Sequence, residues 1–475
     1  MTESEKPTLT SRVGSGGIVA QDGFDFQIWQ ALLRVPEWLL NPAFEGLIIE
    51  GLEDFEARFF MPLSPLGRVL DRYQVKKDEL QRGDLKKVFN AFLAFEKSYP
   101  RRARVHTLIV TGLPSSLKWI ERDPNRVRRA RPFYAPFSDI CAASECRVLE
   151  DFRSEFGDDL GEFVAGCVDV CTQVINDRGA AVAQFSSALH AAFESLDCTQ
   201  RVVQDVFERL ESVMIKGRGR FVSRYMLIDV IESGLSTKII DRDKLCMHVL
   251  SDDSELRNSV FVVDAACFSG KDTCSRTPEE WQDRLVSVLE AASSFFRQLK
   301  VQRIELSGLY RLSVAMVIGW AFRAVYGFEF DIRHRGRNWS VESCPIAGAD
   351  QVVVPWRIDK PNQLVAGRLV VSVGVVRDPS SVVLKFCESD CASDVLRLYL
   401  DRQIVSDSEI QCSVDIIRRT IDDAVREMSP VGIDLFLLCP SVLAVALGHC
   451  WNAFPPTQLY EFDARIQSYV KSACL

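Results

Sequence analysis

The most constraining feature of this sequence is an internal repeat in its C-terminal part. The segments IELSGLYRLSVAMVIGWAF (304–322) and IDLFLLCPSVLAVALGHCW (433–451) align without gaps, so that Ile304 matches Ile433 and Gly319 matches Gly448. Each segment predicts a strand, a short turn and a helix that carries small residues. A chain that repeats such a unit is expected to fold into two similar lobes.

The flanks of the repeat extend both lobes. Each copy is followed by a predicted strand, at 327–332 and 457–462, and is preceded by a predicted strand and a long helix, at 259–266 with 279–299 and at 368–376 with 410–428. Two tandem β-α-β-α-β units predict an α/β sensor region at 251–475. Its two Rossmann-like lobes are expected at about 251–345 and 346–475.

The N-terminal part follows a different pattern. Within residues 1–135 we predict, in order, a helix at 24–40, strands at 46–51, 55–60 and 69–77, a helix at 84–97 and a strand at 104–112. This order favours a small α/β nuclease core over a Rossmann unit, because a Rossmann unit needs strictly alternating helices. Residues 136–250 are predicted to form a helical extension and connector, with helices at 158–175, 180–196 and 199–215 and a break at 216–220.

Composition limits the class of protein. A chain of 475 residues is long enough for two or three domains. No apolar run reaches the roughly 18–20 residues of a membrane helix, so we expect no membrane partner. The start of the sequence has no apolar signal segment, and the 15 cysteines form no CxxC pair. These features predict a cytoplasmic location with reduced thiols and no structural zinc.

Basic residues are concentrated in one segment although the net charge is −8. Between Arg101 and Arg131 lie nine lysines and arginines, opposed only by Glu121 and Asp123. Such a stripe neutralises phosphates, which predicts contact with double-stranded DNA, although a solvated face is the alternative. The predicted DNA-binding residues are Arg122, Arg126, Arg128 and Arg129.

A possible catalytic constellation lies on two neighbouring predicted strands. Asp54 begins one strand, and Gln74 and Lys76 share a face of the next because side chains alternate along a strand. Asp54 and Gln74 are hard oxygen ligands for Mg²⁺ or Mn²⁺, and Lys76 would orient water or stabilise phosphate charge. Glu50 is a further candidate for the catalytic and metal site, and Gln27 approaches from the first helix. A strand with exposed polar residues is the alternative interpretation.

These segments resemble a known family. The runs GSGGIVAQDGFDFQIW, IIEGLEDFEARFF and YQVKK are similar to the N-terminal PD-(D/E)xK-like, restriction-endonuclease-like nuclease domain of CBASS effectors. The repeated helix element and the LYEF segment near the C-terminus resemble the CARF-like lobes of the SAVED domain fused to such nucleases. The resemblance covers nearly the whole chain, with 136–250 covered least. Gln74 stands where many relatives of the wider superfamily have Glu.

The resemblance implies a function. A partner nucleotidyltransferase makes a cyclic trinucleotide on phage infection, the SAVED domain binds this cyclic oligonucleotide, and protomers associate into a homo-oligomer. The nuclease domain then cuts double-stranded DNA with little sequence preference, which is a role in bacterial antiviral defence.

The sensor pocket is expected at the strand-to-helix turns 307–312 and 438–441. Helix N-termini at these turns offer free N–H groups and a positive dipole end to phosphates. Aromatic side chains there are candidates for stacking on bases. Lys271 in FSGKDT is a phosphate candidate without the spacing of a P-loop. The predicted ligand-binding residues are Lys271, Tyr310, Arg311, Trp339, Pro440 and Ser441.

Two other functions are compatible with the sequence. One is a ligand-binding regulator whose nuclease domain is inactive. The other is a modification-dependent restriction endonuclease whose C-terminal lobes read a modified base, although a tandem repeat favours a symmetric nucleotide pocket over a single aromatic cage.

Overall fold

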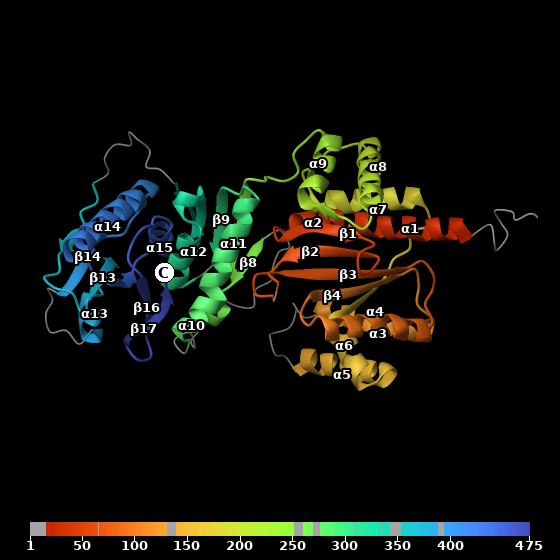
Figure 1. The fold of residues 1–475 in the computed structure, drawn as a ribbon, viewed down its shortest axis with the longest axis horizontal. Helices are drawn as coiled ribbons and strands as arrows, with labels where there is room; N and C mark the ends of the chain where they lie inside the picture. Colours follow the sequence, from red (N-terminus) through yellow and green to blue (C-terminus); the bar gives the residue numbers. More distant parts are fainter. Residues whose placement is uncertain are drawn as a thin grey trace, which may run out of the picture. The chain divides into compact units, whose positions relative to one another are not determined.

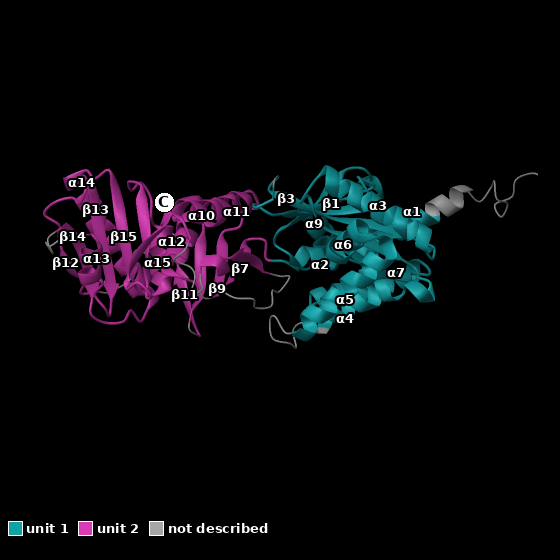
Figure 2. Cartoon of the chain, turned by 90° about the horizontal axis from the view of Figure 1, so that it is seen from below, with its two compact units in different colours: residues 1–240 teal, residues 241–475 magenta. Residues whose placement is uncertain are grey.

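The computed structural model describes residues 16–64, 66–130, 139–250, 260–268, 276–308, 310–334, 336–342, 353–387 and 394–475. The chain divides into two compact units, Met1–Ile240 and Asp241–Leu475 (Figure 2). Both units are mixed α/β structures. Within the described ranges, no helix is long and apolar enough to cross a membrane.

One six-stranded sheet organises the N-terminal unit, with the strand order β5-β4-β3-β2-β1-β6. Its strands are β1 (Phe44–Ile49), β2 (Phe55–Phe60), β3 (Arg68–Lys76), β4 (Ala103–Val110), β5 (Val168–Thr172) and β6 (Phe221–Ser223). Strands β6, β1, β2 and β3 are antiparallel neighbours, whereas β3, β4 and β5 run parallel. The switch from antiparallel to parallel pairing therefore occurs at β3, the strand that carries Gln74 and Lys76.

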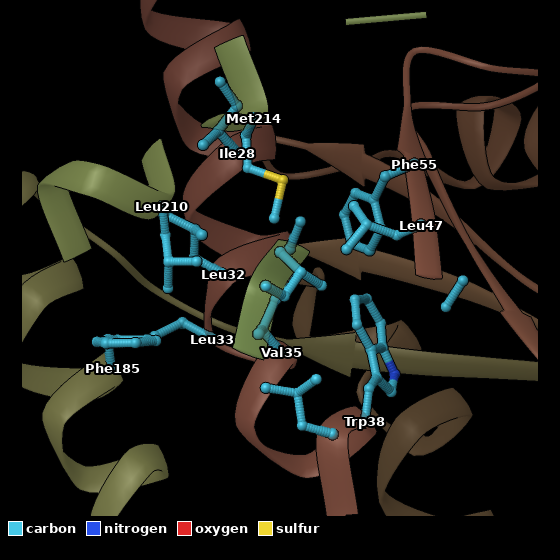
Figure 3. Close-up of a cluster of buried hydrophobic side chains, with 14 of the residues drawn as sticks. Ile28, Leu32, Leu33, Val35, Trp38, Leu47, Phe55, Phe185, Leu210 and Met214 are labelled. Atoms are coloured by element: carbon cyan, nitrogen blue, oxygen red, sulfur yellow. The ribbon is translucent and has the colours of Figure 1, made fainter. Parts of the chain in front are cut away.

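Helices cover both faces of this sheet (Figure 1). They are α1 (Gly16–Leu32), α2 (Val35–Leu40), α3 (Arg82–Ser98), α4 (Trp119–Ala130), α5 (Asp139–Phe156), α6 (Asp158–Cys167), α7 (Arg178–Ala192), α8 (Gln200–Lys216) and α9 (Arg224–Leu235), with a 3-10 turn at Ser115–Leu117. One buried core joins the sheet to α1, α2, α7, α8 and α9 (Figure 3). A second core joins the other face to α3, α4, α5 and α6.

The predicted elements of the nuclease core are present, but several boundaries differ. The predicted helix 24–40 is two helices, because the chain turns after Leu32 and a second helix begins at Val35, with Pro36 in its first turn. The predicted helix 158–175 ends at Cys167, since Val168–Thr172 pairs with β4. The break at 216–220 leads directly into β6 on the edge of the same sheet. Most of the predicted connector 136–250 therefore belongs to the N-terminal unit.

The C-terminal unit contains two sheets, with the orders β11-β10-β9-β7-β8 and β12-β14-β13-β15-β16-β17. The strands of the first sheet are β7 (Lys244–Leu250), β8 (Phe261–Asp264), β9 (Arg303–Gly308), β10 (Glu329–His334) and β11 (Arg337–Val341). Those of the second are β12 (Arg357–Asp359), β13 (Arg368–Val375), β14 (Val395–Leu400), β15 (Gly432–Leu438), β16 (Thr457–Asp463) and β17 (Ser468–Cys474). The helices are α10 (Pro278–Trp281), a π turn (Gln282–Val286), α11 (Ser287–Gln298), α12 (Leu312–Ala321), α13 (Ser380–Phe386), α14 (Asp407–Met428) and α15 (Ser441–His449), with 3-10 turns at Ala266–Phe268 and Ala324–Tyr326.

The repeat seen in the sequence is a repeat of topology. The order β8-β7-β9-β10-β11 in one lobe corresponds to β14-β13-β15-β16-β17 in the other. The structure corrects the predicted match between 259–266 and 368–376, because β8 corresponds to β14 and the partner of β13 is β7. Strand β7 was missed inside a region interpreted as helical, and β14 was missed beside a long helix.

The repeated helices α12 and α15 pack against each other. A Cβ atom on Gly319 would lie 2.0 Å from the Val445 carbonyl oxygen, and one on Gly448 would lie 2.1 Å from that of Met316. The contact is reciprocal, so each lobe contributes the glycine that admits the backbone of the other. The small residues of the repeat are thus explained by the crossing of these two helices.

Candidate functional sites

The first candidate site is built on the connection between β1 and β2, residues 50–54, which we call the acidic turn. The N–H of Glu50 donates to the Asp54 carbonyl at 2.8 Å, and Glu50 has a left-handed backbone with φ of 52°. The Leu52 N–H donates to Oε1 of the buried Glu56 at 2.5 Å. These bonds fix the turn and place Asp54 at the start of β2.

Asp54 faces β3. Its Oδ2 accepts hydrogen bonds from the Gln74 side-chain amide and from the Val75 N–H, the latter at 2.6 Å. Burial raises the pKa of Asp54, while the Val75 N–H, the positive charge of Lys76 and the Gln74 amide act in the opposite direction. The structure therefore brings Asp54 and Gln74 into direct contact, as the order of the strands suggested.

Lys76 lies on the same face of β3 as Gln74, and Val75 between them is buried in the opposite core. Burial raises the pKa of both Asp54 and Glu53, and the positive charge of Lys76 acts against that increase at each of them, so Lys76 lies near both carboxylates. The next residue, Lys77, is different, because its Nζ lies 3.6 Å from Asp22 Oδ2. Of these two neighbouring lysines, only Lys76 shares the strand face of Gln74.

Glu50 has a partner of its own. It forms an ion pair with Arg218, whose guanidinium lies 4.7 Å from the centroid of the Phe24 ring. Burial is the main cause of the raised pKa of Asp54, and the negative charge of Glu50 adds to it, so Glu50 lies close to the site. Gln27 is partly buried on α1, and among the described residues no hydrogen bond joins it to Asp54.

Sequence reasoning missed the Arg72–Glu53 ion pair, which anchors the acidic turn to β3. Arg72 is buried on β3, and its Nη2 lies 2.6 Å from Oε1 of Glu53. The guanidinium carbon lies 3.5 Å from the centroid of the Phe95 ring, and Nη1 lies 3.3 Å from Nδ1 of His106. Burial and Arg72 lower the pKa of His106 to about 3, so this imidazole is neutral. The missed signal was the position of Arg72, two residues before Gln74 on the same strand face.

In the described part of the chain, the acidic turn does not form a closed cage of metal ligands. Among the described residues, no three His, Cys, Asp or Glu side chains are grouped so that they would hold a metal ion. Of the three carboxylates in the acidic turn, Glu50 and Glu53 are paired with arginines, whereas Asp54 accepts two hydrogen bonds through Oδ2 from described residues of β3. A single carboxylate beside a side-chain amide fits Mg²⁺, which retains several waters in such sites.

The predicted basic stripe is not continuous. Arg104 turns to the sheet and donates from Nε to Asp71 Oδ1 at 2.8 Å. On α4, Nε of Arg122 lies 2.6 Å from Asp123 and Nη1 of Arg128 lies 2.6 Å from Asp169. Arg126 and Arg129 are exposed on the same helix, and Arg131 lies outside the described residues. The four predicted DNA contacts are therefore near one another, but two of them already have acidic partners.

The second candidate site is the junction of the two lobes in the C-terminal unit. At the start of α12, the N–H of Ser313 donates to Glu461 Oε1 at 2.6 Å, and Nη1 of Arg311 lies 3.8 Å from Glu461 Oε2. Burial raises the pKa of Glu461, and the contacts with Ser313 and Arg311 act against that increase. Arg311, a predicted ligand-binding residue, is therefore engaged by a carboxyl group of the other lobe.

The start of α15 gathers three other predicted ligand-binding residues. Pro440 precedes the helix, and Oγ of Ser441 lies 3.2 Å from Nδ1 of His334. The Tyr310 hydroxyl is buried beside Ser441, and no described residue completes a hydrogen bond of good geometry to it. Residues of both lobes therefore meet at the start of α15: Tyr310 and His334 belong to the first lobe, and Pro440 and Ser441 belong to the second.

Trp339 lines a cavity of about 890 Å³ together with Ser307, the first residue of the predicted turn 307–312, and Asp407 at the start of α14 in the other lobe. Polar side chains dominate this cavity, including Glu305, Asp331 and Arg333. The guanidinium of Arg337 lies 4.3 Å from the centroid of a Trp339 ring. Lys271, the last predicted ligand-binding residue, falls outside the described residues.

Comparison with known proteins supports the division into two parts. Residues 289–475 match the model of the SAVED domain, the "SMODS-associated and fused to various effectors sensor domain". Two proteins named CD-NTase-associated protein 4 are similar over nearly their whole length. The one from Moraxella osloensis is 21% identical over 96% of this chain and 97% of its own, and the one from an Acinetobacter species is 20% identical over 96% of both.

Solved structures share the fold of the chain. The Acinetobacter baumannii Cap4 SAVED/CARF-domain containing receptor with the cyclic trinucleotide 2'3'3'-cAAA has a TM-score of 0.76 at 17% identity, covering 95% of this chain and 98% of that one. The Moraxella osloensis Cap4 SAVED/CARF-domain containing receptor has a TM-score of 0.70 at 18% identity, covering 96% and 100%. The match to the SAVED model is thus confined to the C-terminal part of the chain, whereas the similarity to these proteins and structures extends over nearly its whole length.

Proposed function

We propose that this chain is a metal-dependent DNA endonuclease of bacterial anti-phage defence that a cyclic oligonucleotide activates. The observation that carries the nuclease assignment is the contact of Asp54 with Gln74 and the Val75 N–H, beside Lys76. The sensor assignment is supported by the SAVED match over residues 289–475 and by the similar receptors that were solved with cyclic trinucleotides.

In the proposed nuclease site, Asp54 and the amide oxygen of Gln74 would hold Mg²⁺ or Mn²⁺, with Glu50 as the further predicted ligand. When bound, such a cation stabilises negative charge on a phosphate and lowers the pKa of a coordinated water. Lys76 would donate a hydrogen bond to the scissile phosphate or orient the attacking water. Arg72 and Glu53 hold the acidic turn against β3, and Glu50 adds negative charge nearby without leaving Arg218.

In the proposed sensor, a cyclic trinucleotide from a partner nucleotidyltransferase would bind at the lobe junction. Tyr310, Pro440 and Ser441 lie at the start of α15, where free N–H groups and the helix dipole favour phosphate. Trp339, in the cavity that it shares with Ser307, and Lys271 are further candidates for ligand contact. Ligand binding would favour an assembled form in which two nuclease sites act on opposite strands of a duplex.

A plasmid cleavage assay with a panel of cyclic di- and trinucleotides tests this function. We expect cutting only when a cyclic trinucleotide and Mg²⁺ or Mn²⁺ are both present, and loss of cutting in EDTA, because the proposed ligands are hard oxygens. Cutting without any cyclic nucleotide would support a modification-dependent restriction endonuclease instead. The absence of cutting with bound ligand and metal would support a regulator with an inactive nuclease domain.

Light scattering tests the proposed coupling. We expect the protein without ligand to be mainly monomeric and inactive at low concentration, and the activating trinucleotide to increase its mass. A ligand shifts that equilibrium only through its different affinity for the two forms. Restored cleavage at an unchanged monomer mass would contradict assembly and require coupling within one chain.

A further inference from the structure

The loop between α8 and β6, residues 216–220, lies at the same end of the N-terminal sheet as the candidate nuclease residues. Its sequence is KGRGR, and we call it the basic loop. Strands β6, β1, β2 and β3 are antiparallel neighbours in that order. The start of β6 therefore lies beside the end of β1, the acidic turn and the end of β3, where Lys76 is the last residue.

Backbone contacts hold the basic loop in a defined conformation. The Gly219 N–H donates to the Ile49 carbonyl at 2.8 Å, and the Arg220 N–H donates to the Gly217 carbonyl at 2.8 Å. Gly219 has a left-handed backbone with φ of 68°, and a Cβ atom on Gly217 would lie 2.7 Å from Cγ2 of Val222. The two glycines thus permit the loop to dock on the end of β1, and its side chains start from fixed positions.

Arg218 ties the basic loop to the acidic turn. Its guanidinium forms the ion pair with Glu50 and lies 4.7 Å from the centroid of the Phe24 ring on α1. The charge of Arg218 is therefore already neutralised within the protein. Arg218 anchors the loop and leaves the contact with an outside anion to the other two cations.

Lys216 and Arg220 carry those two charges. Both side chains are exposed, and neither has an acidic partner within ion-pair distance among the described residues. The chain has a net charge of −8, so acidic side chains are plentiful elsewhere. Two exposed cations on a fixed loop are therefore available for an external anion, and phosphates are the anions that a nuclease substrate supplies.

The distance from the basic loop to the nuclease residues suits the backbone of a duplex. Three strand spacings separate β3 from β6, which is about 14 Å. Each DNA strand carries one phosphate per roughly 3.4 Å of helix axis, so a strand held at Lys76 would bring phosphates about four nucleotides away over the loop. Helix α4 flanks the opposite edge of the sheet, where Arg128 pairs with Asp169 of β5.

We propose, on the basis of the proposed nuclease function, that the basic loop is a contact for the phosphate backbone of duplex DNA. Lys216 and Arg220 bind phosphates, and Arg218 holds the loop on the acidic turn. Contacts of this kind position a duplex without reading its sequence. Because the loop is attached to the end of β1, it fixes the position of the DNA backbone relative to Asp54 and Lys76.

Removing the two unpartnered charges tests the proposal. We would measure binding of two unrelated duplexes to the full chain by fluorescence anisotropy over a salt series, in EDTA to keep the DNA intact, with and without 2'3'3'-cAAA. Each phosphate contact contributes about 0.9 to the slope of log affinity against log salt. We expect Lys216→Gln and Arg220→Gln each to flatten the slope by about 1. The double variant should flatten it by about 2 and lose affinity on the order of 10-fold at about 0.2 M salt.

Arg201→Gln is the matched control. Arg201 is exposed in the first turn of the same 17-residue helix, roughly 20 Å from Lys216 along the axis, and its removal should leave the slope unchanged. Arg220→Lys keeps the charge and should also keep the slope.

An unchanged slope for the double variant, or equal flattening by Arg201→Gln, would overturn the inference and leave the proposed DNA substrate in place. If the original protein bound neither duplex in either condition, the proposed DNA substrate would fail together with this inference, which is a different result.

Discussion

The acidic turn of the N-terminal unit and the lobe junction of the C-terminal unit are both polar sites, but they are assembled over different sequence distances. The contact of Asp54 with Gln74 joins residues 20 apart, and the contact of Ser313 with Glu461 joins residues 148 apart. The first needs only two neighbouring strands. The second needs both lobes to be folded and packed together, so substitutions that disturb packing should weaken this contact more readily than the first.

The two sites also differ in what holds them together. Ion pairs with Arg72 and Arg218 hold the carboxylates of the acidic turn, whereas close packing of α12 on α15 holds the lobes. Substitutions that change charge should therefore test the N-terminal site, and substitutions that change side-chain volume should test the junction. Variants of each kind can therefore separate catalysis from sensing.

The largest effect is expected for Lys76→Ala. Losing a single group that stabilises charge in the transition state typically lowers kcat by about 10²–10³-fold, and we expect at least that loss in ligand-activated plasmid cleavage. Lys77→Ala is the matched control, because Lys77 pairs with the exposed Asp22 and should leave cleavage nearly unchanged. Calorimetry should show the same ligand affinity for both variants. Full cleavage by Lys76→Ala would remove the assigned site.

The difference in sequence separation also explains how much of each site the sequence predicts. Strand order and alternation were sufficient to bring Asp54, Gln74 and Lys76 onto adjacent strands, because both strands belong to one local segment. The Arg72–Glu53 pair was missed, since burial of an arginine depends on the aromatic ring of Phe95 from a helix elsewhere in the chain. Local patterns do not reveal such tertiary partners.

The junction was predictable only in outline. The repeat identified the turns at Tyr310 and Ser441, but not that Glu461 crosses between lobes to occupy Arg311 and Ser313. Strands β5 and β6 were also missed, because they are short and lie in a region with a helical pattern. Whether such a segment forms a strand depends on its pairing with a distant strand, and a single sequence carries little information about that pairing.

An intermediate effect is expected when the lobe junction is overfilled. Gly448→Ala and Gly319→Ala each place a methyl group against backbone atoms of the opposing helix, 2.1 Å from the Met316 carbonyl oxygen and 2.0 Å from that of Val445. Overpacking of this kind costs about 1–3 kcal/mol or more. We expect a lower Tm and weaker ligand binding, measured by calorimetry.

Gly166→Ala provides the control for that prediction. A Cβ atom at Gly166 in α6 meets no atom within 4 Å, so the substitution should be neutral or should stabilise by about 0.5–1 kcal/mol through helix propensity. Equal Tm values for Gly448→Ala and Gly166→Ala would show that the helices of the junction separate easily. The contrast between a charge-held site and a packing-held site would then be wrong.

The smallest effect is expected for charge reversal of the exposed arginines on α4, measured as a change in DNA affinity. Reversing Arg126 and Arg129 should weaken binding to all DNA sequences alike and flatten the dependence of log affinity on log salt by about 2, since each phosphate contact contributes roughly 0.9. Arg122 and Arg128 should each contribute less, because Asp123 and Asp169 already neutralise them.

Arg426→Glu on α14 is the control for a charge change outside the N-terminal unit. Fluorescence anisotropy with two unrelated duplexes over a salt series measures both slopes. If all four α4 variants left the slope unchanged, α4 would be a solvated face, and the DNA contact would have to come from other basic residues of the N-terminal unit.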